Sequence, residues 1–257
     1  MVVVNTTRYG RTDSAQVEAQ LVEALSDAAP STRLKAALRA GTDPEPHLVE
    51  ILVGRSAVEP DFYVRDMLTW ALCRMPPDVT VPRLLDEVRS GNAQACSQAL
   101  HTLSKIGDGR AWPDVSARLH DRDDDVARSA WRAALALVPA GVEGELAADL
   151  GAALGRGDRE LQRSLSRALV GLGEPMLPVL DAAKASPDAK IRAHAAATEA
   201  LYRDPDSAFA LSVEAAKRVT VDPEAAKRVT VDPEAGKRVT VDPETAKRVA
   251  VTGPEGS

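Results

Sequence analysis

The residues with the clearest chemical potential lie in a ten-residue unit that is repeated toward the C-terminal end of the sequence. Glu-Ala-Ala-Lys-Arg-Val-Thr-Val-Asp-Pro occupies residues 214–223 and recurs unchanged at 224–233. A third copy at 234–243 differs by one glycine, and a fourth copy at 244–253 is degenerate. None of the copies contains Cys or Ser, so thioether or thiazole formation would lack its nucleophile. The possible chemistry is therefore limited to backbone amides, the Thr hydroxyl, the Lys amine and the carboxylates.

Two modifications of this unit are chemically feasible. Backbone N-methylation needs an extended segment whose amide N–H is not held in a helix, and the β-branched Val-Thr-Val tripeptide favours extended backbone. Side-chain closure would instead join Thr220 or Lys217 to Asp222 or Glu224 through an ester or an amide. We favour N-methylation. The predicted modification sites are Val219, Thr220, Val221, Val229, Thr230, Val231, Val239, Thr240 and Val241.

The repeated units have too few apolar residues to form a core of their own. Each copy offers only alanines and valines, and a recurring Asp-Pro stops any helix within ten residues. Such short helices are marginal in water, and so little apolar surface does not offset the entropy of ordering. We predict a flexible tail over residues 214–257. A neutral repeat expansion is one alternative, and another is phosphorylation of Thr220, because Lys-Arg-Val-Thr resembles a basophilic kinase site.

A longer repeat of about thirty residues precedes this tail and predicts a helical body. Apolar residues that open a helix recur along the chain, and each is followed four residues later by a second one on the same helical face. The pairs are Leu34 and Leu38, Val64 and Leu68, Ala95 and Ala99, Val126 and Ala130, Leu161 and Leu165, and Ile191 and Ala195. Polar residues suited to N-cap positions precede these helices, which favours a structural role for the acids. These caps are Asp61, Asn92, Asp123, Asp158 and Asp188.

Shorter apolar segments between these helices complete a helix–turn–helix unit, and each unit must bury its apolar face against its neighbours. Asp61-Phe-Tyr-Val-Arg and Pro187-Asp-Ala-Lys-Ile-Arg resemble the second helix of HEAT repeats. The resemblance implies an all-α fold, a right-handed α-solenoid of about six HEAT-like helix pairs. The predicted domains are an N-terminal extension (1–13), the repeat domain (14–213) and the tail (214–257). Because the family consists chiefly of binding scaffolds, the resemblance also implies protein binding and no enzymatic activity.

A folded head followed by near-identical short units is similar to precursors of ribosomally made, modified peptides. The architecture and the Val-Thr-Val tripeptide resemble precursors of the split borosin class. This resemblance implies a separate methyltransferase that binds S-adenosylmethionine and acts on the tail, whereas this chain would bind no cofactor itself. An ATP-dependent ligase is the partner that side-chain closure would require. A plain HEAT scaffold with a non-essential or partner-binding tail is the alternative function.

Composition argues against several other functions. The net charge of −6 lacks the cationic excess of typical nucleic-acid binders. No apolar run reaches membrane-spanning length and no signal peptide is evident, so we expect a cytoplasmic protein without membrane contact. Cys73 and Cys96 lack metal or redox spacing, and we interpret both as core thiols.

Catalytic patterns are likewise weak. A HEAT-like DNA glycosylase would need an aromatic cleft, for which Trp70, Trp112, Trp131 and Asp124 are conceivable, but Trp70 is predicted to face the core. The histidines show neither zinc-binding nor triad spacing. They are His47, His101, His120 and His194.

Overall fold

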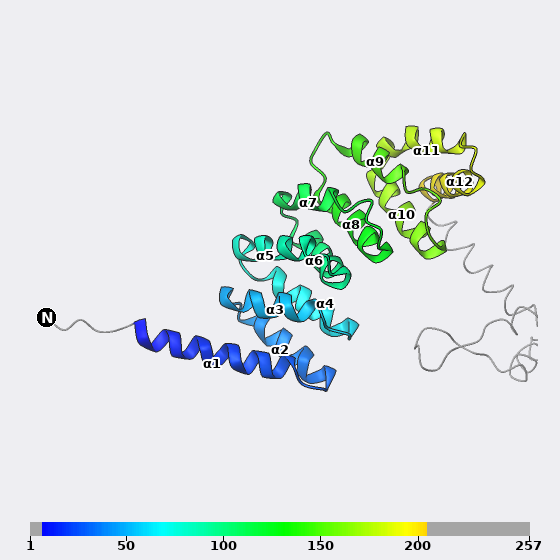
Figure 1. Ribbon diagram of the computed structural model, residues 1–257. Coiled ribbons are helices and arrows are strands. Elements are labelled where there is room, and N and C mark those ends of the chain that lie inside the picture. The colour runs from blue at the N-terminus through cyan, green and yellow to red at the C-terminus, as the bar shows by residue number, and fades with distance from the viewer. Residues whose placement is uncertain (1–6, 205–257) are drawn as a thin grey trace, which may run out of the picture. The chain divides into compact units, whose positions relative to one another are not determined.

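The computed structural model describes residues 7–204, with side chains described from residue 14, and every regular element in this part is helical (Figure 1). The chain divides into two compact units, residues 1–198 and 199–257. The α-helices of the described part are α1 (Thr7–Leu25), α2 (Pro30–Thr42), α3 (Val49–Ser56), α4 (Phe62–Cys73), α5 (Pro77–Arg89), α6 (Ala93–Ile106), α7 (Trp112–Ser116), α8 (Asp124–Leu137), α9 (Glu143–Gly151), α10 (Arg159–Leu172), α11 (Leu177–Lys184) and α12 (Ala189–Arg203). Three short 3-10 helices precede α3, α7 and α11, namely η1 (Pro46–Leu48), η2 (Gly109–Ala111) and η3 (Glu174–Met176).

Odd- and even-numbered helices of the first unit form two layers. Figure 1 shows α3, α5 and α7 in one layer and α4, α6 and α8 in the other. Successive second helices pack directly on one another, α2 on α4, α4 on α6, α6 on α8 and α8 on α10. The predicted α-solenoid of about six helix pairs is confirmed within the described residues. The first helix of the stack, α1, begins at Thr7.

The polar residues predicted as helix caps accept hydrogen bonds from the first free amides of the second helices. Asp61 accepts from the amides of Tyr63 and Val64. Asn92, Asp123, Asp158 and Asp188 cap α6, α8, α10 and α12 in the same way. These acids satisfy backbone donors that would otherwise be orphaned, so their structural interpretation is confirmed.

An arginine near the start of three second helices ties each helix to the turn before it. In every case one guanidinium nitrogen donates to the two backbone carbonyls five and six residues earlier. These bonds satisfy two turn carbonyls before each of the three helices. Arg33 binds the carbonyls of Asp27 and Ala28, Arg65 those of Glu59 and Pro60, and Arg192 those of Ser186 and Pro187.

Both members of the predicted apolar pair are buried in α4, α6, α8 and α10, whereas Ile191 of α12 is only half-buried and the pair in α2 is out of register. Leu68, Ala99, Ala130, Leu165 and Ala195 are all buried, whereas Leu38 is 42% exposed. The N-cap of α2 is Ala29, so the position that Leu34 was predicted to fill belongs to Thr32, and Ala36 takes the buried place assigned to Leu38. The prediction for Leu38 was wrong because the polar Thr32 interrupts the apolar pattern there.

Two further core predictions were wrong. Trp70 is 39% exposed, and the Arg74 guanidinium lies 5.3 Å from the centroid of its ring. Cys73 is exposed, whereas Cys96 is buried as predicted. Both residues lie in the last turn of α4, which also contains the buried residues Ala71 and Leu72. Burial raises the pKa of the Cys96 thiol to about 11, so this thiol stays protonated at neutral pH.

The approach of α2 to α4 depends on the absence of a side chain at Gly41. A Cβ at this position would lie 2.3 Å from Cζ3 of Trp70 and 2.8 Å from the Cα of Ala71. The Gly41 carbonyl also accepts a hydrogen bond of 2.6 Å from Nε of Arg74. Trp70 therefore lies across the first inter-repeat contact and covers the backbone of α2.

We predict that Gly41→Ala lowers the free energy of unfolding by about 1–3 kcal/mol, because a methyl group would overpack this contact. Chemical denaturation of the full chain measures the effect. Gly54→Ala is the matched control, since that glycine lies inside α3 with open space around it. The control should raise stability by roughly 0.5–1 kcal/mol through helix propensity. Equal effects of both substitutions would contradict the close contact at Gly41.

Candidate binding groove

The residues predicted from the sequence to be modified, Val219–Val221 and their counterparts in the next two copies, lie outside the described residues. The described part instead presents an open groove along the second helices α4, α6 and α8, with about 1240 Å³ of empty space. The groove is polar, with hydroxyls, amides and guanidinium groups along its length. Its lining residues are Phe62, Arg65, Ala93, Gln94, Ser97, Gln98, His101, Asp123, Asp125, Arg128, Ser129 and Arg132.

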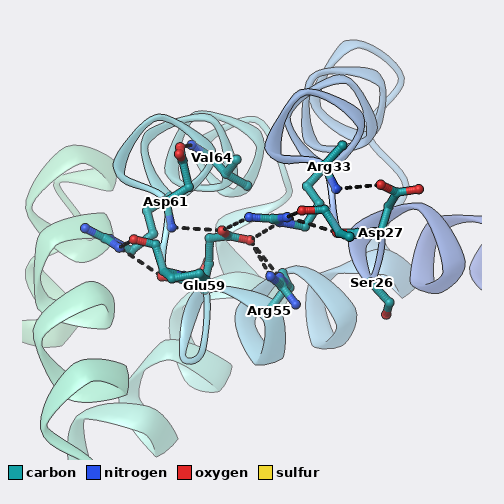
Figure 2. Close-up of polar contacts among 12 residues, drawn as sticks. Ser26, Asp27, Arg33, Arg55, Glu59, Asp61 and Val64 are labelled. Carbon is teal, nitrogen blue, oxygen red and sulfur yellow. Dashed lines mark hydrogen bonds and ion pairs between the residues drawn. The ribbon is translucent and has the colours of Figure 1, made fainter. Parts of the chain in front are cut away.

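Glu59 fixes the N-terminal end of this groove. Its side chain is fully buried, and both carboxylate oxygens accept hydrogen bonds (Figure 2). Arg33 of the preceding repeat donates from Nε at 2.8 Å and from Nη2 at 2.7 Å. Arg55 donates to the same carboxylate from α3, and the backbone amide of Asp61 donates at 2.9 Å. One carboxylate thus joins α2, α3 and the start of α4.

The backbone carbonyl of Glu59 extends this connection into the groove. It accepts hydrogen bonds from Nη1 of Arg65 at 2.9 Å and from Nε2 of Gln94 at 3.1 Å. Arg65 and Gln94 both line the groove, on α4 and α6 respectively. The Glu59 residue therefore contacts three successive repeats and sets the position of two groove side chains.

The charge state of Glu59 follows from two opposing effects. Burial alone would raise its pKa, but the hydrogen bonds from Arg33, from the Asp61 amide and from Arg55 lower the pKa to about 2. The carboxylate is therefore ionised at neutral pH and balances two partly buried guanidinium groups. Removing such a partner leaves the buried opposite charges uncompensated.

Hydroxyl contacts hold α6 against α8 along the groove. Ser97 and Ser129 lie 2.7 Å apart through their Oγ atoms, and Ser97 also contacts the carbonyl of Asp125. Below them, the buried hydroxyls of Thr69 and Thr102 lie 3.4 Å apart between α4 and α6. These small polar residues keep the second helices close together and leave the longer side chains to project over them.

Groups of like charge gather at the far end of the groove. Burial lowers the pKa of Arg132, and the neighbouring Arg128 and Arg167 lower it further, with Glu160 opposing them. Burial likewise lowers the pKa of His101, with Lys105 and Arg132 acting in the same direction and Asp66 opposing. His101 is therefore mainly neutral at pH 7, because its pKa lies below the ordinary value of 6.5.

A Ser–His contact that sequence spacing did not reveal lies elsewhere, between α10 and α12. Oγ of Ser166 is 3.1 Å from Nε2 of His194, and both residues are buried. Nδ1 of His194 accepts a hydrogen bond from the Gly155 amide, so the ring proton is on Nε2, which contacts the Gln162 carbonyl. This tautomer cannot take a proton from Ser166 through Nε2. The pair is a buried structural contact and not a nucleophile with its base.

The residues considered for a glycosylase cleft do not come together as one. Trp131 is buried, and its indole Nε1 donates to the carbonyl of Leu119. Asp124 is bound by the Arg156 guanidinium at 2.7 Å. Among the described residues, no group of His, Cys, Asp and Glu has a metal-binding arrangement. No helix in the same part of the chain is long and apolar enough to span a membrane.

Comparison with known proteins agrees with this architecture. Residues 45–136, which span α3 to α8 and contain the groove, match the family model of HEAT repeats. No curated protein matches this chain. The family-model match agrees with the resemblance to HEAT repeats that the sequence motifs indicated, and it covers the central repeats of the helical stack.

Several solved structures resemble the chain at low identity. An engineered protein is 19% identical, with a TM-score of 0.39, and the match covers 70% of this chain and 93% of that one. A second engineered protein is 16% identical, with a TM-score of 0.39, and the match covers 71% and 96% of the two chains. A designed armadillo repeat protein is 12% identical, with a TM-score of 0.34, and the match covers 71% and 98%.

We predict that Glu59→Gln lowers the free energy of unfolding at pH 7 by about 3 kcal/mol, because a depressed pKa stores stability of this order. The folded pKa of about 2 lies below the ordinary value of 4.5, so this contribution is full above pH 4.5 and disappears as the pH falls toward 2. Denaturant titrations across this pH range should show a flatter profile for the variant.

Glu50→Gln is the matched control for this substitution. Glu50 also pairs with an arginine, Arg83, but its side chain is 69% exposed. An exposed ion pair contributes about 0–1 kcal/mol, so the control should change stability little. If the two variants were equally stable, the buried carboxylate would not hold the repeats together.

Proposed function

We propose that this HEAT-repeat protein is a non-enzymatic scaffold that binds a partner protein along the groove of α4, α6 and α8. The observation that carries the proposal is a set of groove side chains that are available for binding. Gln98, His101 and Arg132 line the groove, and within the described residues their side chains have no hydrogen-bond partner. A protein segment laid across them would satisfy these groups. The hydroxyls of Ser97 and Ser129 beneath them keep the floor of the groove in place.

Site-specific crosslinking tests this assignment. A photo-crosslinking amino acid replaces Gln98 in the groove or, as the control, Glu145 on the first helix α9, in the full chain expressed in its own cells. Glu145 is exposed and lies outside the groove lining. We expect a discrete crosslinked partner from position 98, retained after deletion of residues 214–257, and none from position 145. Crosslinking from position 145 alone, or from neither position, would reject the groove as the binding surface.

A second proposal concerns the tail and rests on its sequence. The copies at 214–243 are nearly identical, neutral and free of Cys and Ser, which suits a tethered substrate that one enzyme meets repeatedly. The finer hypothesis is that a separate methyltransferase, using S-adenosylmethionine, methylates the backbone at Val219–Val221 and the matching positions. The helical body would then recruit that enzyme, and the groove is its available docking surface.

Intact-mass analysis and peptide mapping test the tail proposal after co-expression of the full chain with the methyltransferase or ligase encoded beside its gene. N-methylation predicts added mass in units of one methylene, confined to residues 214–253. Side-chain closure predicts the loss of one water for each ring. Replacing Thr220 by Val separates the two, because methylation of the backbone would continue while an ester at Thr220 would not form. An unmodified tail would reject the substrate hypothesis and leave the scaffold proposal intact.

A further inference from the structure

One surface position of the four central second helices, α4, α6, α8 and α10, carries a distinct set of side chains. The ninth residue after the N-cap is Trp70 in α4, His101 in α6, Arg132 in α8 and Arg167 in α10. These helices stack in that order, so the four positions form a row across the second-helix layer. Trp70, Arg132 and Arg167 are exposed, and His101 is half-buried in the groove wall.

Cationic groups accumulate along this row although the chain as a whole has a net charge of −6. We call Lys105, Arg128, Arg132 and Arg167, together with His101, which is mainly neutral at pH 7, the basic stripe. In the described part of the chain, neither an ion pair nor a side-chain hydrogen bond engages Lys105, Arg132 or Arg167. Arg128 alone has acidic partners within the stripe, contacting Glu160 at 3.4 Å and Asp125 at 3.7 Å.

The acidic groups that face the stripe are Asp66, Glu160, and Asp123 and Asp125 of the groove lining, and in the described part of the chain only Asp125 and Glu160 form ion pairs with it, both through Arg128. Asp66 acts on His101 from α4, and Glu160 acts on Arg132 from α10. Arg128 and Arg132 lie one turn apart on α8, and Arg167 occupies the matching position on the neighbouring helix α10, so three guanidinium groups share one surface. In agreement with this placement, Arg128 and Arg167 each lower the pKa of Arg132. Nε of Arg128 is also buried without a hydrogen-bond partner. Such a cluster is electrostatically unfavourable in the free protein, and an anionic partner would relieve the repulsion.

We propose that the basic stripe binds an extended acidic segment of the partner protein, with a carboxylate at about every third residue. The inference rests on the proposed scaffold function and names the chemistry of its partner. Packed helices lie about 8–10 Å apart, and a peptide in the extended polyproline II conformation rises about 3.1 Å per residue with three residues per turn. Three residues of such a peptide therefore span one repeat, and every third side chain points to the same face. A carboxylate in this register would face His101, Arg132 and Arg167 in turn.

The groove favours a peptide over a nucleic acid for two reasons. A nucleic acid carries a charge on every phosphate, so the net negative charge of the whole chain opposes its approach. The side chains beside the stripe are also suited to a polypeptide backbone, because Gln94, Gln98 and Ser97 offer both donors and acceptors. Phe62 adds an apolar contact at one end of the lining.

Fluorescence anisotropy with the full chain tests the proposal. The probe is a labelled Gly/Ser peptide with Glu at every third residue, compared with a peptide of the same composition whose Glu residues are clustered and with one bearing Lys. We expect the spaced Glu peptide to bind most tightly and the Lys peptide not to bind. Arg132→Gln and Arg167→Gln should each weaken binding by roughly tenfold, as expected for charge-assisted hydrogen bonds.

Arg89→Gln is the matched control, since it removes the same charge from the first helix α5, where Arg89 pairs with Asp114. It should leave affinity within about twofold, and circular dichroism confirms that each variant is folded. An equal loss of affinity in Arg89→Gln would contradict the role of the basic stripe. Equal affinity for the clustered peptide would contradict the three-residue spacing. Preferential binding of single-stranded DNA of equal charge would overturn the choice of a peptide. Crosslinking from position 98 without binding of the Glu peptide would reject this inference while leaving the scaffold function in place.

Discussion

A buried carboxylate at Glu59 holds the first repeats of this protein in one arrangement. Three donors from separate elements converge on it, Arg33 from α2, Arg55 from α3 and the amide of Asp61 at the start of α4. Because a buried charge is costly unless its hydrogen bonds are complete, the two guanidinium groups and the carboxylate stabilise one another only in this geometry. The Glu59 carbonyl then binds Arg65 and Gln94, so the same residue determines where the groove begins.

The rest of the stack is held by weaker contacts of the same kind, which are hydrogen bonds from long side chains to the turn before each helix. Where the repeat retains its arginine, as in Arg65 and Arg192, the guanidinium binds the carbonyls of its own turn. Where the motif departs from the pattern, another residue satisfies the turn. Arg156 reaches back from the following repeat to the carbonyl of Asp121, and Gln162 binds those of Gly155 and Gly157. The degenerate repeats therefore fold because their turn carbonyls find different donors, and this explains why a loose sequence match still gives a regular stack.

Local features were predictable from the sequence, and long-range ones were not. The caps at Asp61 and Asp123 depend only on the next three residues, so their identity sufficed to place them. The buried role of Glu59 depends on Arg33, 26 residues away, and no local pattern indicates that contact. The error at Leu38 has a related cause. Helical periodicity predicts that one face is apolar, but without a polar cap residue the sequence does not show where α2 begins, and its N-cap is Ala29. The groove was not predictable for the same reason, since three helices must stack before its lining exists.

The structural roles of the repeat positions also explain which positions can determine specificity for a partner. Capping fixes an acid or amide before every second helix except α2, carbonyl binding fixes an arginine or glutamine near the start of α2, α4, α10 and α12, and packing fixes apolar residues along one face. The ninth position after the cap has none of these duties, and it varies from Trp70 to His101 to Arg132 and Arg167. Substitutions there change the surface without loss of a buried contact, except at Trp70, which covers Gly41. A stack of this kind can therefore change its partner at the ninth position while its fold is maintained by the others.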